Sequence, residues 1–148
     1  MNASEVRRMM HSLLGSGMTS QQVEQLAQAS VSRTIATGHA LMSEGDRPSG
    51  LLLLLQGRAE IFKLGRDGQR QSLAKVDAPT VLGEMSLITE HSASATVIAL
   101  TDCECQLLTR AQFQRLIASE SLAAYKLVVF IAEVLADRLA RLDRKVLE

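Results

Sequence analysis

The residues of this 148-residue chain best suited to binding chemistry lie in the segment VLGEMSLITEHSASATV, from Val81 to Val97. Gly83 allows a ligand to approach the backbone closely, and Glu84 can accept hydrogen bonds from a hydroxyl. The amides of the short turn that follows could point at an anion. Yet no Lys or Arg occurs from Val81 to Thr101, so the segment has the features of an anion site without its usual cation.

The cysteines and histidines offer metal or redox chemistry, but their spacing does not favour it. Cys103 and Cys105, the two cysteines of the chain, would share one face of a strand and could hardly form an unstrained disulfide. Because an iron–sulfur cluster takes four ligands, we expect core thiols, with a metal or redox role as the alternative. His11, His39 and His91 lack zinc-site spacing, although His91 could titrate near neutral pH. We predict no metal site.

The composition indicates a single domain, residues 1–148, in the cytoplasm. Hydrophobic residues form 47% of the chain, which is enough for a packed core. The absence of a disulfide framework and of a signal-peptide pattern favours a reducing compartment. The longest apolar runs, Leu51–Leu55 and Leu127–Ala132, are too short to span a bilayer, so we expect no membrane contact.

Charge and motif content argue against DNA binding and against catalysis. Sixteen basic and sixteen acidic residues cancel, so the chain lacks the gross positive charge of a nucleic-acid binder. We find no carboxylate pair, nucleophile–base arrangement or Walker loop in the sequence. The sequence therefore predicts neither a DNA-binding protein nor an enzyme.

The elements that must position the 81–97 segment are helices at both ends of the chain and strands between them. Thr19 with Gln22, and Thr109 with Gln112, form capping boxes that specify two helix N-termini. Between them, an Asp-Gly pair at Arg66–Gly68 signals a hairpin, and short apolar runs alternate with turn residues. Many short strands with frequent turns favour an antiparallel sandwich or barrel.

The last segment, SLAAYKLVVFIAEVLADRLARLDRKVLE, predicts a long helix with one apolar stripe. Apolar residues recur there at spacings of three or four: Val128, Ile131, Leu135, Leu139, Leu142 and Val146. Asp137 and Arg141 form an i,i+4 pair on the polar side. The stripe extends beyond what one small β-domain could easily cover. We therefore predict a parallel homodimer through this helix, with packing on its own domain as the alternative.

Three motifs follow one another in order along the chain: GHALMSEGDRPSGLLLLLQGRAEIF, VLGEMSLITEHSASATV and ALTDCECQLLTRAQFQRLI. Together they resemble the cyclic-nucleotide-binding domain of the catabolite activator and protein kinase A regulatory-subunit superfamily. The resemblance implies an eight-stranded antiparallel β-roll of the jelly-roll type with the ligand inside it. It implies N-terminal helices over residues 1–30, the roll over 31–108, and C-terminal helices, the last one long, over 109–148.

The second motif stands where the family has its phosphate-binding cassette, here residues 82–96. The resemblance implies ligand contacts from these positions: Leu82, Gly83, Glu84, Met85, Ser86, Ala93, Ser94 and Ala95. Where the family keeps an Arg paired to the cyclic phosphate, this chain has Ala93. Loss of one charge-assisted hydrogen bond weakens binding about ten- to a hundredfold. Another arginine, such as Arg47 or Arg58, could supply the charge.

The resemblance therefore implies a non-enzymatic regulatory module with a degenerate or altered cassette and weak binding of cyclic AMP or cyclic GMP. We expect it to act in trans through contact with an unidentified protein, because no sequence remains after the last helix for the helix-turn-helix domain of the family's transcription factors. Two alternatives stay open. One is a genuine cyclic-nucleotide or other nucleotide sensor whose counter-charge comes from another residue. The other is a dimeric scaffold that has lost its ligand.

Overall fold

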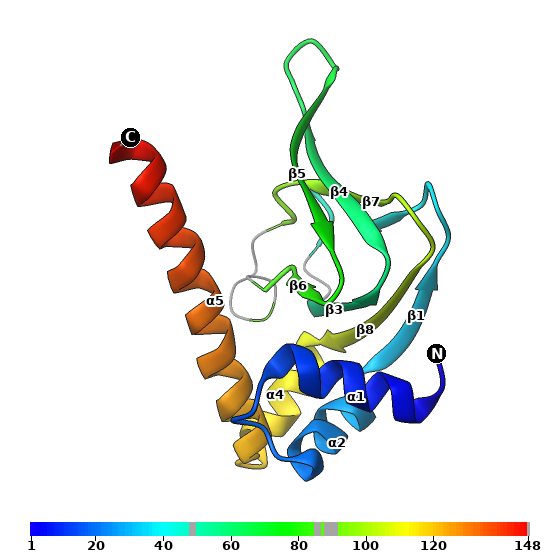
Figure 1. Ribbon diagram of the computed structural model, residues 1–148, viewed down its shortest axis with the longest axis vertical. Coiled ribbons are helices and arrows are strands. Elements are labelled where there is room, and N and C mark those ends of the chain that lie inside the picture. The colour runs from blue at the N-terminus through cyan, green and yellow to red at the C-terminus, as the bar shows by residue number, and fades with distance from the viewer. Residues whose placement is uncertain (48–49, 85–86, 88–91, 148) are drawn as a thin grey trace.

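The computed structural model describes residues 1–47, 50–84, 87 and 92–147, and only the backbone of 143–147. Its centre consists of two four-stranded antiparallel sheets (Figure 1). One sheet has the order β1 (Val31–Ile35), β8 (Cys103–Thr109), β3 (Gly50–Gln56) and β6 (Thr80–Leu82). The other has the order β2 (Ala40–Met42), β7 (Thr96–Ala99), β4 (Arg58–Leu64) and β5 (Arg70–Asp77). Together the sheets form the predicted β-roll.

Strand β3 explains why the sheet that contains it has a core on each face. Its leucine run is buried along its whole length, and alternate side chains enter different clusters. Leu51, Leu53 and Leu55 pack with the helices, whereas Leu52 and Leu54 face the interior of the roll. A continuous apolar run is therefore the pattern of a strand covered on both faces.

The hairpin between β4 and β5 forms at the Asp-Gly signal. The Gly65 amide donates to the Gln69 carbonyl at 2.8 Å, and the Gly68 amide donates to the Gly65 carbonyl at 2.9 Å. The Asp67 carboxylate accepts from the Gln69 amide at 3.1 Å. Figure 1 shows this hairpin projecting from the body of the roll, with β5 at the edge of its sheet.

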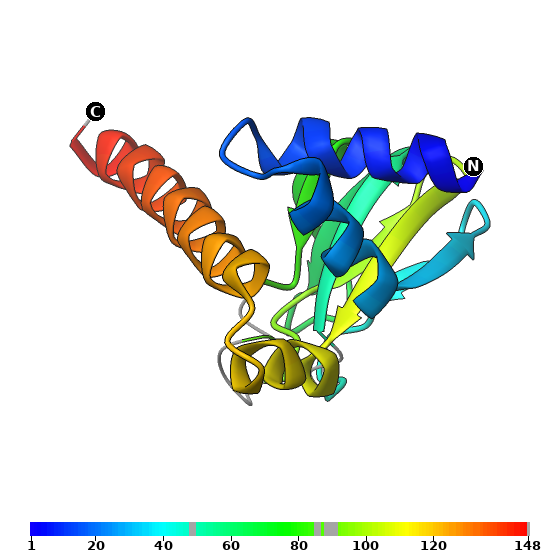
Figure 2. The ribbon, with the colours of Figure 1, turned by 90° about the horizontal axis from the view of Figure 1, so that it is seen from below.

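Helices α1 (Ala3–Leu14) and α2 (Ser20–Ala29) cover the sheet that contains β3 and β8 (Figure 2). The capping box at Thr19 forms as predicted, since its side chain accepts from the Gln22 amide at 3.1 Å and the Gln22 side chain accepts from the Thr19 amide at 3.0 Å. Asn2 and Glu5 form a second box at the start of α1. These caps fix the residues at which both helices begin.

Helix α4 (Arg110–Ala118) follows β8 directly. Thr109 caps it by accepting from the Gln112 amide at 3.2 Å. The sequence also predicted that the Gln112 side chain accepts from the Thr109 amide. Between these two described residues that second bond does not form, so only half of the capping box is present.

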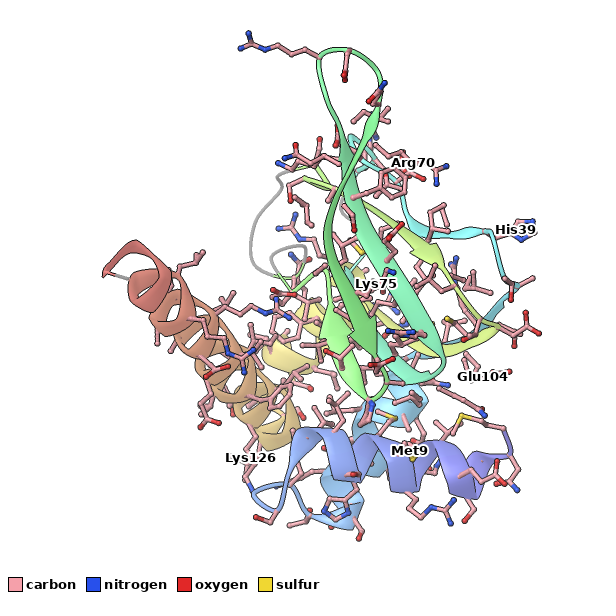
Figure 3. All side chains as sticks on the ribbon, turned by 45° about the horizontal axis from the view of Figure 1, so that its top comes forward. Met9, His39, Arg70, Lys75, Glu104 and Lys126 are labelled. Atoms are coloured by element: carbon pink, nitrogen blue, oxygen red, sulfur yellow. The ribbon has the colours of Figure 1, made fainter. Side chains whose placement is uncertain are left out.

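Helix α5 (Leu122–Leu147) contacts the rest of the chain from its beginning as far as Arg138, and its end extends away from the domain in Figure 1. Its beginning is held by Lys126, which donates to the Gly17 carbonyl at 2.7 Å and to the Gln22 side chain at 2.9 Å (Figure 3). Ile131 is only 1% exposed and packs in the cluster shared with α1 and α2. Its assignment to a dimer stripe is therefore wrong, because its own domain already covers it.

The rest of the predicted stripe divides between the core and the surface. Leu135 is half-buried against the same cluster as the N-terminal helices. Val128, Leu139 and Leu142 are 36%, 61% and 58% exposed. The side chain of Val146 lies outside the described residues. The apolar surface left for a second subunit is thus centred on the outer half of α5.

Among the residues that the structure describes, none of the helices combines the length and the apolar character that crossing a bilayer requires.

Candidate functional site

A cavity of about 620 Å³ is lined by strands of both sheets, the cassette and α5. Its volume is in the range of small-molecule sites. Most of its wall is apolar, with few polar groups. The described lining residues are Met42, Ile61, Leu73, Ala74, Val76, Leu82, Gly83, Glu84, Ser92, Ala93, Ser94, Ala95, Val97 and Arg138. The structure therefore brings together the predicted positions Leu82, Gly83, Glu84, Ala93, Ser94 and Ala95.

A larger hollow of about 770 Å³ lies between α2 and the connection from α4 to α5. It is lined mainly by side-chain amides and hydroxyls, and the sequence predicted no chemistry there. The cavity beside the cassette is the better candidate, since its wall contains a buried carboxylate and a guanidinium that face each other.

Gly83 leads the chain from β6 into the cavity wall. Its φ of +69° lies in the left-handed region, which glycine adopts without the strain of a side chain. A Cβ at this position would lie 3.0 Å from Met42 Cε and 3.2 Å from the Gly50 carbonyl oxygen. The Leu87 amide donates to the Glu84 carbonyl at 3.4 Å. Met85 and Ser86, two of the predicted contacts, lie outside the described residues, as does His91.

Ala93 is held in the wall by its backbone. Its amide donates to the Asp46 carbonyl at 3.0 Å, and its carbonyl accepts from the Gly45 amide at 2.8 Å. The side chain at this position therefore contributes one methyl group to the cavity wall. Ser94, its neighbour, is exposed while it lines the same cavity.

Glu84 is the charged residue buried in the described part of the chain, with 7% of its surface exposed. Its carboxylate Oε1 accepts from Nη1 of Arg138 on α5. Nη2 of the same guanidinium donates to the Val81 carbonyl on β6 at 3.2 Å. A buried carboxylate without a partner is strongly destabilising, and Arg138 supplies that partner.

Burial and neighbouring charges act on the pKa of Arg138. Burial has the largest effect and lowers the pKa of the guanidinium below its ordinary value, and the neighbouring Arg141 lowers it further. The Glu84 carboxylate opposes both because it favours the charged form. An arginine remains protonated at neutral pH, so the pair consists of one positive and one negative charge.

The two arginines that the sequence offered as substitutes for the missing cation are not part of the described cavity wall. Arg58 pairs with Asp77, with 3.0 Å between Nε and Oδ1. Arg47 is exposed. Arg138, which the sequence did not single out, lies in the wall instead. Its only sequence signal was its place on the polar side of the last helix, close to the favourable pair of Asp137 and Arg141, which forms at 3.0 Å.

The two cysteines lie away from this site, in the interior of the roll. Cys103 and Cys105 are 0% and 2% exposed, which confirms the core assignment. Burial raises the pKa of both thiols, that of Cys105 to about 12. No group of three or more His, Cys, Asp or Glu side chains suited to a metal ion occurs in the part of the chain that the structure describes.

Two relatives align in sequence with most of this chain. It is 31% identical over 111 residues to the cyclic AMP receptor protein of Thermus thermophilus, covering 75% of this chain and 51% of that protein. It is 31% identical over 100 residues to the cAMP-dependent protein kinase regulatory subunit of Neurospora crassa, covering 68% of this chain and 25% of that subunit. The chain thus spans about half of the first relative and a quarter of the second.

Solved structures agree with the fold. The Thermus thermophilus catabolite activator protein superposes with a TM-score of 0.73 at 28% identity, over 90% of this chain and 62% of that one. A cyclic nucleotide-binding domain from Methylobacillus flagellatus superposes with a TM-score of 0.84 at 24% identity, over 97% of this chain and 82% of that one. The family model described as cyclic nucleotide-binding domain matches residues 32–120. The chain belongs to the cyclic nucleotide-binding domain family.

Proposed function

We propose that this chain is a non-enzymatic regulatory module with an altered cassette, which binds cyclic AMP or cyclic GMP weakly and acts on a partner protein in trans. One observation carries the proposal. The cavity wall has a methyl group at Ala93, and the carboxylate of Glu84 that would accept a ribose hydroxyl is already bonded to Arg138. The cyclic AMP receptor protein among its relatives supports the ligand class.

The charges of the wall support weak binding. Among its described residues, Glu84 and Arg138 are the charged ones, and their charges cancel. A cyclic phosphate carries one negative charge, so it enters a site without net positive charge and competes with Glu84 for the guanidinium. The loss of one charge-assisted hydrogen bond is worth about 1.5–3 kcal/mol, or ten- to a hundredfold in affinity.

Calorimetry of Ala93→Arg with cyclic AMP and cyclic GMP tests this function. We expect little or no heat from the wild type and an affinity at least roughly tenfold higher from the variant, the scale of one charge-assisted hydrogen bond. Since this gain is electrostatic, it shrinks as the salt concentration rises. The control is Ala40→Arg, which adds the same charge at an exposed position outside the cavity wall and leaves binding unchanged.

Two results contradict the proposal in different ways. Tight binding by the wild type means that the altered cassette does not weaken the site, and the domain is then a genuine cyclic-nucleotide sensor. No gain in Ala93→Arg means that the cavity does not accept the ligand, and the dimeric scaffold then becomes the better description.

A further inference from the structure

A carboxylate of the cassette and a guanidinium of the last helix line the same cavity and bond to each other. Arg138 lies 54 residues from Glu84 in the sequence, yet its Nη1 donates to the Glu84 carboxylate and its Nη2 donates to the Val81 carbonyl at 3.2 Å. Figure 1 shows α5 passing beside β6 on the side where the cassette begins. The helix therefore brings a positive charge into the cavity that Ala93 also lines.

We propose that Arg138 is the anion-binding residue of this cavity and takes over the role left empty by Ala93. The ligand that fits is a phosphate ester of a hydroxylated sugar, because such a molecule satisfies both members of the ion pair. Its phosphate accepts from the Arg138 guanidinium, and a sugar hydroxyl donates to the Glu84 carboxylate. This inference rests on the proposed function, since it requires that the cavity binds a nucleotide-like ligand.

The donor geometry of arginine suits this role. A guanidinium has five N–H donors in a planar fork that matches phosphate, and the two bonds described here use only Nη1 and Nη2. Its side chain is 43% exposed, in contrast to 9% for Glu84, so it can rotate toward a ligand while the carboxylate stays in place. Arg138 is also the positively charged side chain among the described residues of the cavity wall.

The ion pair makes the site selective for ligands that carry both groups. A ligand with only a phosphate removes Arg138 from Glu84 and leaves a buried carboxylate without its partner, which is unfavourable. A ligand with only hydroxyls leaves the guanidinium bound to Glu84 and therefore gains little binding free energy. A sugar phosphate replaces one ion pair by two charge-assisted hydrogen bonds. Competition with Glu84 also accounts for weak anion binding in the wild type.

The test uses inorganic phosphate, which has no sugar hydroxyl, and follows its binding to the full chain by NMR titration into the millimolar range. Glu84→Gln keeps the shape of the side chain but removes the competing charge, so phosphate affinity rises roughly tenfold. Glu84→Gln with Arg138→Gln loses this gain. Glu84→Gln with Arg141→Gln keeps it, because Arg141 lies on the same helix but pairs with Asp137 at the surface.

A second comparison uses cyclic AMP and the single variants. By NMR titration, which registers weak binding that gives little heat, Arg138→Gln lowers the cyclic AMP affinity at least roughly tenfold relative to wild type, whereas Arg141→Gln leaves it unchanged. Unfolding midpoints in urea check that each variant folds. The variant that lacks both charges serves as the folded reference, since it leaves no unpaired ion in the wall.

The outcomes separate this inference from the proposed function. If Ala93→Arg gains cyclic AMP affinity but Glu84→Gln gains no phosphate affinity, the cavity is a nucleotide site and Arg138 is not its cation. Phosphate binding by Glu84→Gln that persists without Arg138 overturns the inference as well, because the anion is then bound elsewhere. If neither Ala93→Arg nor Glu84→Gln gains affinity, the proposed function fails together with the inference.

Discussion

Gly83 shows how a single residue limits the shape of the cavity. Its left-handed φ of +69° and the nearby Met42 and Gly50 leave little room for a side chain. We expect Gly83→Ala to lower the free energy of unfolding by about 2–5 kcal/mol. The left-handed conformation accounts for roughly 1–2 kcal/mol of this, and the overpacking for roughly 1–3 kcal/mol. Urea unfolding followed by circular dichroism measures the change.

The matched control is Gly68→Ala in the β4–β5 hairpin. Gly68 has a similar φ of +79°, but a Cβ there would meet no atom within 4 Å. In this variant the free energy of unfolding therefore falls only by the cost of the left-handed conformation, roughly 1–2 kcal/mol. Equal losses at the two glycines would show that the packing around Gly83 contributes nothing.

At the scale of residues, the family pattern pointed to positions that line one cavity where the structure describes them, but it did not point to Arg138. Glu84 and Ala93 line one cavity, as the aligned motif implied. Arg138 comes from a different element, and helical periodicity does not show which surface that element crosses. The sequence raised the question of a counter-charge because no Lys or Arg occurs from Val81 to Thr101. It could not show that Glu84 is buried and therefore requires a partner, which Arg138 supplies.

At the scale of elements, strong local patterns predicted the structure best. The Asp-Gly hairpin formed where the turn chemistry placed it, and the leucine run became the strand buried on both faces. The last helix was predicted as a helix, but not the point where it leaves the domain. Periodicity fixes one face of a helix along its whole length, whereas tertiary packing covers only the part that reaches Ile131 and Leu135.

The outer half of α5 carries the prediction about assembly. Leu139 and Leu142 are 61% and 58% exposed, and such apolar side chains on one helix face favour contact with a second copy. We expect a parallel homodimer, with twice the chain mass in analytical ultracentrifugation. Leu139→Asp with Leu142→Asp reduces the mass to that of one chain, because four buried carboxylates at the interface repel one another.

The control for this prediction adds the same charge to the same helix. Ala136→Asp with Ala140→Asp changes exposed positions off the apolar face and leaves the dimer intact. Ile131→Asp has a different effect and unfolds the domain, since Ile131 is part of its own core. A wild-type monomer at tens of micromolar, on the order of the concentration that reveals micromolar association, would contradict the prediction.

At the scale of the whole molecule, the sheet of β1, β8, β3 and β6 separates two hydrophobic cores. One lies between this sheet and the helices, and the other fills the interior of the roll. Helix α5 contacts both the helical core and the cavity. Ile131 packs in the helical core, while Arg138 reaches the cavity beside the roll interior. The same helix therefore lines the cavity through Arg138 and carries the exposed leucines.

The interior of the roll also contributes to the dependence of the domain's stability on pH, through its two thiols. Burial raises the pKa of Cys105 from its ordinary value of 9.0 to about 12, and it raises the pKa of Cys103 in the same direction. Between these values the unfolded chain releases its thiol protons while the folded chain retains them. The unfolded state then binds fewer protons, so the free energy of unfolding falls as the pH rises.

We therefore expect the stability that the thiols contribute to be fully present below pH 9 and to be lost progressively between about pH 9 and pH 12. For one thiol, the free energy of unfolding cannot fall by more than about 1.4 kcal/mol per pH unit, and solvent screening reduces this slope. Urea unfolding across this range measures the decline. Lysine and tyrosine titrate there too, so the comparison is with Cys103→Ala and Cys105→Ala combined, which keeps those groups. The wild type should lose stability more steeply than this variant. Parallel curves would mean that the thiols ionise as readily in the folded roll as in the unfolded chain.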